Sequence, residues 1–488
     1  MSFQAPPTLL TLAVQSLLKD EALAISALQD LPMELFPPLF KAAFDGRQLK
    51  ILKAMVAAWP FPCLPVGALM KFPDVTTLKA VLDGVDMQLT GNFCQRVRKL
   101  QVLDLRNVHH DFWDVWAGPE DGDHSAETAC HSAETACERQ RRKRLHRYAL
   151  RQHLKVVTDL CLGFHLDKHQ AYLLQWAKKR RGSLHLCCMK MQIWGLSMDT
   201  VRKVLSIFQP DSIEELELSI AWTLSTMAHF APCLGQMRNL RKLCLTLKHE
   251  NFFRPVITPT ALEGKRATEF ISQFSKLNCL QYLYMTGVYF LNGHMRKLLW
   301  CLKTPLEFLS IALCKFSQSD LESFVQCQSL CHLKHLELGG VTLSDLSLVP
   351  LRIFLESVAD TLQTLDLEHC RMNDSQLSAL FPALSRCSQL IKVNFYDNDI
   401  SMAVLKDLLC HTANLGQLIL ELYPAPLECY EIGYVISIDR FVQLSSELRN
   451  TLCAVRQPQS FSFATYICLE CCQRSFYDAE MTLCLCWQ

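Results

Sequence analysis

The cysteines near the end of the sequence are the residues whose spacing most directly suggests chemistry. Cys468 and Cys471 form a C-x-x-C pair, and Cys484 and Cys486 form a C-x-C pair after twelve intervening residues. Four thiolates on two short turns are the ligands of a tetrahedral structural zinc, which leaves no open position for catalysis. A C-terminal cap with reduced thiols is the simpler alternative, because Cys472 adds a fifth thiol and the chain holds 24 cysteines.

The remaining sequence contains no recognisable catalytic constellation. It lacks G-x-x-x-x-G-K-[ST], G-x-G-x-x-G, H-E-x-x-H and G-x-S-x-G, which argues against phosphate-binding loops, Rossmann turns, zincin helices and nucleophile elbows. Cysteine and histidine are frequent, but no spacing selects a Cys/His pair. We therefore expect a protein that is not an enzyme, has no catalytic residues and needs no cofactor apart from the alternative structural zinc.

A second pattern is typical of a short docking helix. Residues 31–39 place Leu31, Pro32, Leu35 and Leu39 in an apolar-Pro-x-x-apolar-x-x-x-apolar order. Proline is favoured in the first turn of a helix, and the following apolar residues share one face. Such a helix either packs on its neighbours or lays its apolar face in a groove of another protein. Spacing alone favours packing, because buried helices produce the same pattern.

The elements that position these residues follow from a strand signature, L-x-x-L-x-L, in the C-terminal half. Its first positions are 25 to 40 residues apart, and they are Ile213, Leu240, Leu280, Leu306, Leu333, Leu362, Leu390 and Leu415. Such a period identifies leucine-rich repeats, in which strand-and-helix units stack because none buries its apolar side alone. We predict an α/β leucine-rich repeat solenoid, a horseshoe of the ribonuclease-inhibitor type. Its concave strand surface is the expected protein-binding surface.

Strand residues between the buried leucines should point outward, because side chains alternate along a strand. They form an aromatic group followed by an acidic row: Tyr282, Tyr284 and Phe308, then Glu337, Asp366, Glu368 and Glu421. This combination suits a basic peptide or protein surface, although ordinary scattered surface composition explains it more simply. An L-x-x-L-L sequence at 405–409, of the kind that docks coregulators into nuclear receptors, falls in a repeat helix whose leucines are expected in the core.

The chain before the regular repeats looks different. Its first helices are very apolar, with Leu9, Leu12 and Leu23 among the residues spaced for buried helix faces. Early strands are expected at Leu100–Leu105 and Leu184–Leu186. We predict an N-terminal helical cap, irregular early repeats, regular repeats and a C-terminal cap with a cysteine-rich tail, at residues 1–95, 96–210, 211–425 and 426–488.

Residues 117–146 are predicted to be a disordered insertion. They hold a tandem heptapeptide, HSAETAC, at 124–137 and a basic run from Arg141 to Arg144. Turn-forming and charged residues precede the heptapeptide, and such a composition does not pack a core. Metal binding by the duplicated His and Cys is the alternative for the heptapeptide. The basic run is either a solvated charge cluster or a nuclear localisation signal.

Charge and hydropathy narrow the classes of function further. The 49 Lys and Arg nearly balance the 48 Asp and Glu, so no overall field favours direct binding of nucleic acid or a membrane surface. The first residues lack the pattern of a signal peptide, and charged residues interrupt each apolar stretch before it reaches a bilayer-spanning length. We expect a soluble intracellular protein with reduced thiols, which is cytoplasmic and, if the basic run is a localisation signal, also nuclear.

Several longer stretches resemble the PRAME family, the relatives of preferentially expressed antigen in melanoma. The similarity covers nearly the whole chain and runs through QSLLKDEALAISALQDLPMELFPPLFKAAFDGR, LKAMVAAWPFPCLPVGALMK, KLQVLDLRNVHHDFWDVW, DSIEELELS, PLEFLSI, LSRCSQL, LYPAPLE and FYDAE. The resemblance implies a leucine-rich horseshoe that serves as a substrate receptor of a cullin-2 RING ubiquitin ligase, joined through elongins B and C. It leaves the protein client unidentified, because a fold does not name its partner.

The resemblance also implies docking residues near the N-terminus. The cullin-box pattern maps onto Leu31, Pro32, Leu35 and Leu39. The elongin box is best matched from Ser16 and Leu17, with Glu21 where the family pattern has Cys and Ile25 at the closing apolar position. Family members are also described as repressors of retinoic acid signalling, promoters of proliferation and inhibitors of apoptosis and differentiation. A transcriptional corepressor or scaffold without ligase attachment is therefore the alternative function.

Overall fold

The computed structural model of the chain describes residues 8–70, 74–90, 100–117, 154–247, 261–431, 435–478 and 480–486. The tandem heptapeptide and the basic run that follows it lie outside these described residues. The chain divides into two compact units, Met1–Lys190 with Arg202–Gln209 and Met191–Val201 with Pro210–Gln488. The division falls inside β4 (His185–Trp194) and α9 (Met198–Leu205).

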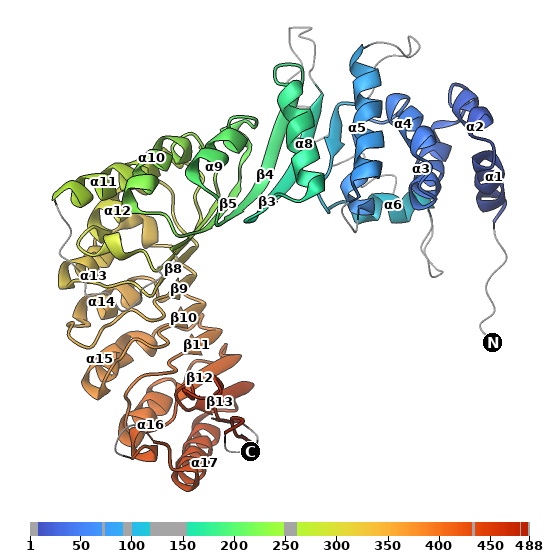
Figure 1. Cartoon of the computed structure of the whole chain (residues 1–488). Coiled ribbons are helices and arrows are strands. Elements are labelled where there is room, and N and C mark those ends of the chain that lie inside the picture. Colours follow the sequence, from blue (N-terminus) through green and yellow to red (C-terminus); the bar gives the residue numbers. More distant parts are fainter. Residues whose placement is uncertain are drawn as a thin grey trace. The chain divides into compact units, whose positions relative to one another are not determined.

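The first unit begins with helices, as the sequence predicts for residues 8 to 70. Its elements are α1 (Leu9–Leu18), α2 (Glu21–Ala27), η1 (Met33–Leu35), α3 (Phe36–Asp45), α4 (Leu49–Ala57), η2 (Val66–Leu69), α5 (Val75–Thr90), α6 (His110–Ala117) and α8 (Lys168–Lys179), where η marks a short 3₁₀ helix (Figure 1). Asp20 begins α2 as a cap, because its carboxylate accepts hydrogen bonds from the backbone of Ala22 and Leu23.

Aromatic side chains form the core of the first unit. The buried ring of Phe40 packs edge-on against Trp59, with ring centroids 5.3 Å apart, and stacks on Trp113 at 5.6 Å. Both indole nitrogens donate hydrogen bonds of 2.9 Å, Trp59 to the carbonyl of Cys63 and Trp113 to the carbonyl of Pro65. The polar edges of the buried rings are thereby paired, and the bond of Trp113 ties α6 to the segment after α4.

The first unit also contains three parallel strands, β1 (Cys63–Leu64), β2 (Val102–Asp104) and β3 (Lys155–Leu162). The sequence predicts β2 and β4. Leu100 lies just before β2 and Leu103 at its centre, Leu184 lies just before β4 and Leu186 within it, and all four side chains are buried. The sequence misses β1 because two residues are too short for an alternating pattern.

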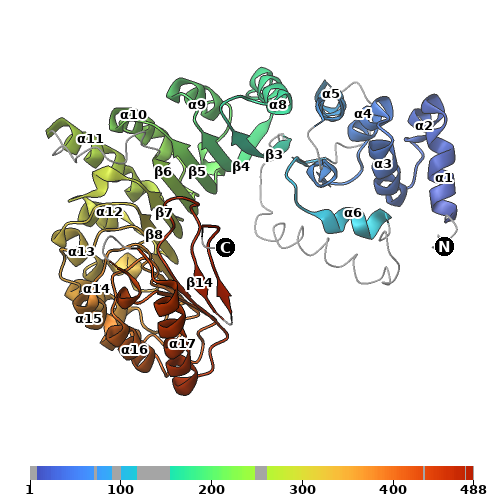
Figure 2. The ribbon, with the colours of Figure 1, turned by 60° about the horizontal axis from the view of Figure 1, so that its bottom comes forward.

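The second unit is the predicted leucine-rich repeat array. Parallel strands stand side by side with one helix after most of them, and the helices lie along one side of the sheet (Figures 1 and 2). The strands are β5 (Glu215–Ile220), β6 (Lys242–Leu247), β7 (Tyr282–Thr286), β8 (Phe308–Ala312), β9 (His335–Glu337), β10 (Thr364–Asp366), β11 (Lys392–Asn394) and β12 (Leu420–Pro424). The helices are α10 (Leu224–Leu234), α11 (Ala261–Ser272), α12 (Met295–Cys301), α13 (Gln318–Val325), α14 (Val349–Ser357), α15 (Asp374–Leu384) and α16 (Met402–His411), with short turns η3 (Pro210–Ser212), η4 (Gln273–Lys276), η5 (Tyr289–Leu291) and η6 (Gln328–Leu330).

Burial along the strands confirms the repeat signature. The eight predicted first positions are each 2% exposed or less. The second and third leucines of a unit, such as Leu283 and Met285 in β7, are buried, whereas the residues between them keep part of their surface. The buried leucines therefore stack on one side of the sheet and face the helices.

Polar side chains form hydrogen bonds with backbone groups in the turns after the strands. The buried amide of Asn398 donates to the carbonyls of Leu367 and Phe395 and accepts from the backbone N–H of Met372, at 2.8, 2.9 and 2.9 Å. Cys370 fills the same place in the preceding unit, where its thiol is 3.2 Å from the carbonyl of Leu338. One asparagine here serves three backbone groups that would otherwise be buried without partners.

The last repeat is aligned differently from the prediction. Strand β12 pairs Glu421 with Val393, so its unit starts at Leu418 and not at Leu415, and Glu421 takes the place of a buried leucine. The prediction that Glu421 points outward is wrong, since it is 0% exposed. Its carboxylate accepts hydrogen bonds from the guanidinium of Arg456 and, at 2.6 Å, from the hydroxyl of Tyr423. A buried carboxylate is tolerated here because a cation and a donor are paired with it.

The C-terminal end covers this last repeat. It consists of η7 (Leu427–Cys429), α17 (Ile438–Val455), β13 (Ser460–Ala464), β14 (Phe476–Tyr477) and β15 (Met481–Thr482). Strand β13 runs parallel to β12, and β14 and β15 then continue the sheet in antiparallel order. Arg456 follows α17 directly, so the end of this helix supplies the guanidinium that pairs with Glu421.

Candidate metal centre and docking surfaces

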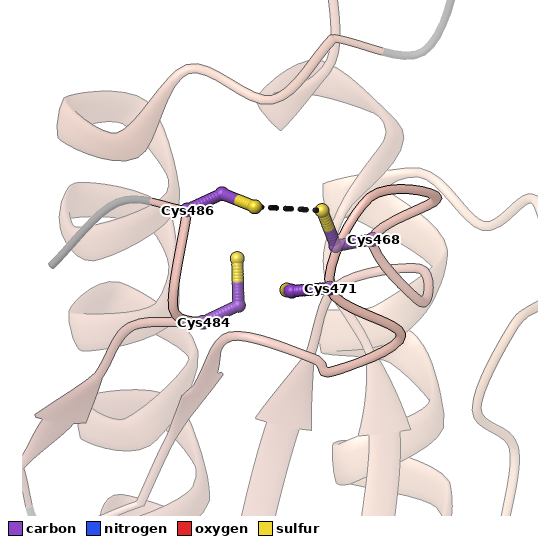
Figure 3. A group of neighbouring side chains, drawn as sticks. All are labelled: Cys468, Cys471, Cys484 and Cys486. Carbon is purple, nitrogen blue, oxygen red and sulfur yellow. Dashed lines mark hydrogen bonds between the residues drawn. The ribbon is translucent and has the colours of Figure 1, made fainter.

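The two cysteine pairs lie on two neighbouring segments of the C-terminal end. Cys468 and Cys471 belong to the loop between β13 and β14, and Cys484 and Cys486 follow β15. Backbone hydrogen bonds fold the loop back on itself, from Cys472 to the carbonyl of Cys468 at 2.9 Å and from Cys468 to that of Gln473 at 2.8 Å. Strands β14 and β15 lie between the loop and the tail, and they bring the C-x-x-C pair of the loop next to the C-x-C pair of the tail (Figure 3).

The four thiols converge on one point. Their sulfur atoms all lie within 4.8 Å of one another, and those of Cys468 and Cys486 are 3.7 Å apart (Figure 3). Cys484 is buried, Cys468 and Cys471 are half-buried, and Cys486 is exposed. In the part of the chain that the structure describes, no other group of His, Cys, Asp or Glu side chains is arranged to hold a metal ion. The predicted ligand set is thus brought together in space.

The electrostatics of the cluster favour one thiolate. Desolvation opposes ionisation of Cys471, but hydrogen bonds from the backbone N–H of Gln473 and from the thiols of Cys468 and Cys486 outweigh it and lower its pKa to about 6. The contacts of Cys486 with Cys471 and Cys468 instead raise the pKa of the Cys486 thiol to about 12. Of these two thiols, Cys471 therefore carries a negative charge more readily.

A cavity of about 1180 Å³ lies beside this cluster. The ends of several repeats and the loop after β13 line it, with Glu368, Asp397, Tyr466, Leu469 and Arg474 among the lining residues. Arg474 donates to the carboxylates of Glu368 and Asp397, and Tyr466 donates to Asp399 at 2.8 Å. The loop that carries Cys468 and Cys471 is therefore tied to the repeats by charged hydrogen bonds.

The predicted outward residues of the middle strands do lie side by side on the sheet. The rings of Tyr284 and Phe308 stack with centroids 4.4 Å apart, and the Phe308 ring lies 5.3 Å from that of His335. Apart from the buried Glu421, the predicted residues of this surface are each partly exposed: Tyr282, Tyr284, Phe308, Glu337, Asp366 and Glu368. Strand register sets Tyr284, Ser310, Glu337 and Asp366 in one row, so the aromatic group continues directly into the acidic one.

Part of the acidic row already has partners. The side-chain amide of Asn394 donates to Asp366 and to Glu368, both at 2.9 Å, and Glu368 also binds Arg474. Within the described residues no cation forms an ion pair with Glu337, and burial raises the pKa of its carboxyl group despite a hydrogen bond from Ser310 and the charge of Lys392. Among the predicted acidic residues, Glu337 is the carboxylate that would benefit most from a basic group on a partner.

The predicted docking helix near the N-terminus is exposed at its start and buried at its end. Pro32 is exposed and precedes η1, Leu31 and Leu35 are half-buried, and α3 begins only at Phe36. Leu39 is 1% exposed and belongs to the core of the first unit. The inclusion of Leu39 among the docking residues therefore needs correction, because a side chain that fills the core cannot also enter a groove of a partner.

The elongin-box residues lie on α1 and α2. Ser16 and Glu21 are exposed, and Glu21 forms an ion pair of 2.8 Å with Lys50. Leu17 and Ile25 are half-buried. At the position where the family pattern has Cys, this chain therefore has Glu21, whose carboxylate is paired with Lys50 of the same unit.

The surrounding surface of α1 and α2 is a feature that the sequence reading missed. Leu9, Leu12 and Leu23, which were predicted to face the core, are 86%, 47% and 55% exposed. Within the described residues of α1, only Val14 is buried. Their spacing fits a helical face, but spacing does not say whether the chain itself or another protein covers that face.

The L-x-x-L-L sequence is buried as predicted. Leu405, Leu408 and Leu409 lie on α16 and face the core of the repeats, each 1% exposed or less. Their burial removes this segment from the candidate docking surfaces.

Comparison with protein families divides the chain at an earlier point than its two compact units do. The PRAME N-terminal domain matches residues 6–113, and the PRAME C-terminal domain matches residues 154–486. The chain belongs to the PRAME family. Among its relatives, human PRAME family member 20 is 45% identical over 100% of both chains, and human PRAME family member 12 is 46% identical over 99% of this chain and 98% of its own. The mouse preferentially expressed antigen in melanoma-like protein 7 is 43% identical over 99% of both.

Solved structures similar to this PRAME-family protein include two internalins from Listeria monocytogenes. One is 18% identical over 44% of this chain and 72% of its own with a TM-score of 0.25, and the other is 14% identical over 54% and 72% with a TM-score of 0.28. The repeat assignment rests on the strand register and burial given above. Among the described helices, none is long and apolar enough to cross a membrane.

Proposed function

We propose that this PRAME-family protein is a non-catalytic substrate-recognition adaptor of a cullin-2 RING ubiquitin ligase. In this proposal it joins the ligase through elongins B and C and binds client proteins on the exposed strand surface of its repeats. The family resemblance implies this role. The observation that best supports it is the accessible apolar surface of α1 and α2, because a helix face of this kind is how one protein enters a groove of another.

The attachment surface consists of two adjoining parts. The first is the exposed leucine surface of α1 and α2, represented by Leu12 and Leu23, which we assign to elongin C. The second is the accessible start of the docking helix, Leu31 and Pro32, which we assign to cullin-2. Helix α3, anchored by Leu39, holds the second part in place.

The client surface is the row of aromatic and acidic residues on β7 to β10. Stacked aromatic rings offer a large apolar contact at low entropic cost, and tyrosine is frequent at binding hot spots. The half-buried carboxyl group of Glu337, next to Asp366 in the row, favours a client with a basic side chain at this point. The cavity lined by Glu368 and Arg474 extends the same surface toward the C-terminal end.

The alternative function, a transcriptional corepressor or scaffold without ligase attachment, receives less support. Its most direct sequence feature was the L-x-x-L-L segment, whose leucines are packed in the repeat core. Docking through them would require α16 to leave the array, and each buried leucine would lose about 1.5–3 kcal/mol of burial energy.

A binding assay with purified components tests the adaptor proposal. The intact chain is mixed with elongin B–elongin C and with cullin-2, and each component is quantified after capture. We expect Leu12→Asp with Leu23→Asp to lose elongins and cullin-2, and Leu31→Asp with Pro32→Ala to lose cullin-2 but keep elongins. Circular dichroism and size-exclusion profiles equal to those of the intact chain establish that the variants are folded.

The matched control is Ile353→Asp, which places the same charge on an exposed apolar position of α14. It should bind both components like the intact chain. If the intact chain captures neither elongins nor cullin-2, the adaptor proposal is wrong. If the α1–α2 variant binds them as well as the Ile353→Asp control does, the assigned attachment surface is wrong.

A further inference from the structure

We propose that Cys468, Cys471, Cys484 and Cys486 bind one zinc ion as a structural site with four thiolate ligands. The four sulfurs come from two segments, the loop after β13 and the tail after β15, and converge within 4.8 Å of one another. A Cys₄ set is a closed site in which every coordination position is taken by protein, so its role is to hold the two segments together.

The separation of the sulfurs fits a metal better than a disulfide. In a regular tetrahedron with zinc–sulfur bonds of about 2.3 Å, neighbouring sulfurs are about 3.8 Å apart. Cys468 and Cys486 are 3.7 Å apart, already at that distance, and the widest pair at 4.8 Å needs a closure of roughly 1 Å, which side-chain rotation supplies. A disulfide would instead place two sulfurs at about 2 Å and leave the other two unpaired.

The backbone around the thiols is already arranged for this role. Backbone hydrogen bonds from Cys472 to the carbonyl of Cys468 and from Cys468 to that of Gln473 close the loop that carries the C-x-x-C pair. Cys472, directly after the C-x-x-C pair, has φ of 55°, a left-handed conformation that lets the chain turn sharply and point successive N–H groups toward the ligands. Ser475 contributes further support, because its hydroxyl accepts from the N–H of Cys484 at 3.0 Å. Such second contacts orient metal ligands.

Charge and proton balance are simple at this site. All four ligands bind the dication as thiolates and release to the solvent whatever protons they still carry, so the complex has two negative charges that neighbouring N–H groups stabilise. No oxidant or reductant is required. Zinc suits the site because tetrahedral sulfur sites select zinc or iron among common metals, and a partly exposed mononuclear site without redox chemistry calls for zinc.

The metal would fix the wall of the neighbouring cavity. Tyr466 and Arg474 lie on either side of the C-x-x-C pair, and they bind Asp399 and Asp397 of the repeats. A zinc ion that joins this loop to the tail after β15 would hold Tyr466 and Arg474 in position for their contacts with the repeats. This consequence concerns the shape of the C-terminal end, and the zinc proposal does not depend on ligase attachment.

Metal analysis of the full chain, purified under reducing conditions without chelator, tests the proposal. We expect about one zinc per chain by inductively coupled plasma mass spectrometry, reflecting one closed site. Cys471→Ser and Cys484→Ser should each lose most of it. Cys472→Ser is the matched control, because Cys472 is an exposed cysteine next to a ligand and outside the cluster, and it should retain the zinc of the intact chain.

Cobalt substitution of the intact chain gives a measurement that needs no variant. Four thiolates should produce intense sulfur-to-cobalt charge-transfer absorption and the visible bands of a tetrahedral complex, at one cobalt per chain, and zinc should displace it. Three results would overturn the proposal: an intact reduced chain that takes up no zinc after addition of the metal, a Cys484→Ser variant that keeps as much zinc as Cys472→Ser, or a metal-free chain with a Cys468–Cys486 disulfide. Iron in place of zinc would overturn the identity of the metal.

Discussion

The two ends of the chain differ in whether the apolar surface of their terminal elements is covered. At the C-terminal end, α17 and β13 to β15 cover the last repeat, and even the buried carboxylate of Glu421 has a guanidinium and a hydroxyl as partners. At the N-terminal end, α1 leaves Leu9 and Leu12 exposed in the part of the chain that the structure describes. The described elements cover the last repeat at one end, whereas they leave an apolar surface open at the other, as the proposed attachment to elongin C requires.

The largest expected effect comes from breaking the completed end. Arg456→Met removes the cation from a fully buried carboxylate, and losing one partner of a buried pair costs about 3–5 kcal/mol. The free energy of unfolding from urea titration, followed by circular dichroism, should fall by that amount for the transition of the repeat unit.

A double substitution sharpens this prediction. Glu421→Leu with Arg456→Met restores leucine at the repeat position and removes the charge as well, so most of the lost stability should return. If Arg456→Met costs less than about 1 kcal/mol, the carboxylate is reached by water and the C-terminal end is not closed as described.

The next largest effect contrasts two leucines of the N-terminal unit. Leu39→Ala empties a core position and should cost about 2–5 kcal/mol, whereas Leu12→Ala on exposed α1 should change stability by no more than about 0.5 kcal/mol. Urea titrations of both variants measure the difference. A destabilisation by Leu12→Ala that approaches that of Leu39→Ala would show that the chain itself covers α1 and would remove the contrast between the ends.

A smaller loss is expected inside the repeat array. Asn398→Ala leaves the carbonyls of Leu367 and Phe395 and the N–H of Met372 without their side-chain partner. Because water can reach some of these groups, the free energy of unfolding should fall by about 1–3 kcal/mol in total. Hydrogen exchange should show the loss as faster exchange of the Met372 amide. Unchanged exchange there would mean that the turn does not depend on the asparagine.

The smallest effect is a change in pH dependence on the proposed client surface. Burial raises the pKa of Glu337 above its ordinary value of 4.5, so the folded chain keeps this proton to higher pH than the unfolded chain. Protonated Glu337 therefore contributes to the stability of the folded chain at low pH, and this contribution is lost as pH rises through the folded pKa.

Glu337→Gln cannot lose a proton in this range. Its stability relative to the intact chain should rise as pH increases above about 4.5 and then level off. Thermal unfolding midpoints from pH 4 to 7 measure this difference. An advantage that does not change with pH would mean that the carboxyl group is well solvated.

The sequence is a good guide where a pattern repeats. The first seven repeat positions, the helical start of the chain and the burial of the L-x-x-L-L leucines follow from periodicity, because each repeat must bury the same face. The alignment of the last repeat does not follow from it. The L-x-x-L-x-L spacing also fits Leu415, Leu418 and Leu420. Strand pairing instead places Leu418, Glu421 and Tyr423 at the buried repeat positions. A glutamate at a leucine position becomes acceptable only through Arg456, which is 35 residues away in sequence.

The candidate sites show the same limit. The spacing of the four cysteines left two readings open, a shared metal site and a cap with reduced thiols, and the structure brings the four thiols together. The exposure of Leu9, Leu12 and Leu23 was not predicted, since an apolar helical face reads the same whether it meets the core or a partner. The burial of Leu39, next to the half-exposed Leu35, depends on the aromatic core around Phe40 and is invisible in local spacing.

The pairing of Glu421 with Arg456 also has a consequence for biosynthesis. The ribosome delivers β12 before it delivers α17 and the arginine that follows it, and domains fold as the chain emerges. Until Arg456 has left the exit tunnel, the last repeat can close only around an uncompensated carboxylate. A nascent chain that stops within α17 would therefore display an unfinished repeat to chaperones and proteases, and only a chain translated beyond it would escape them.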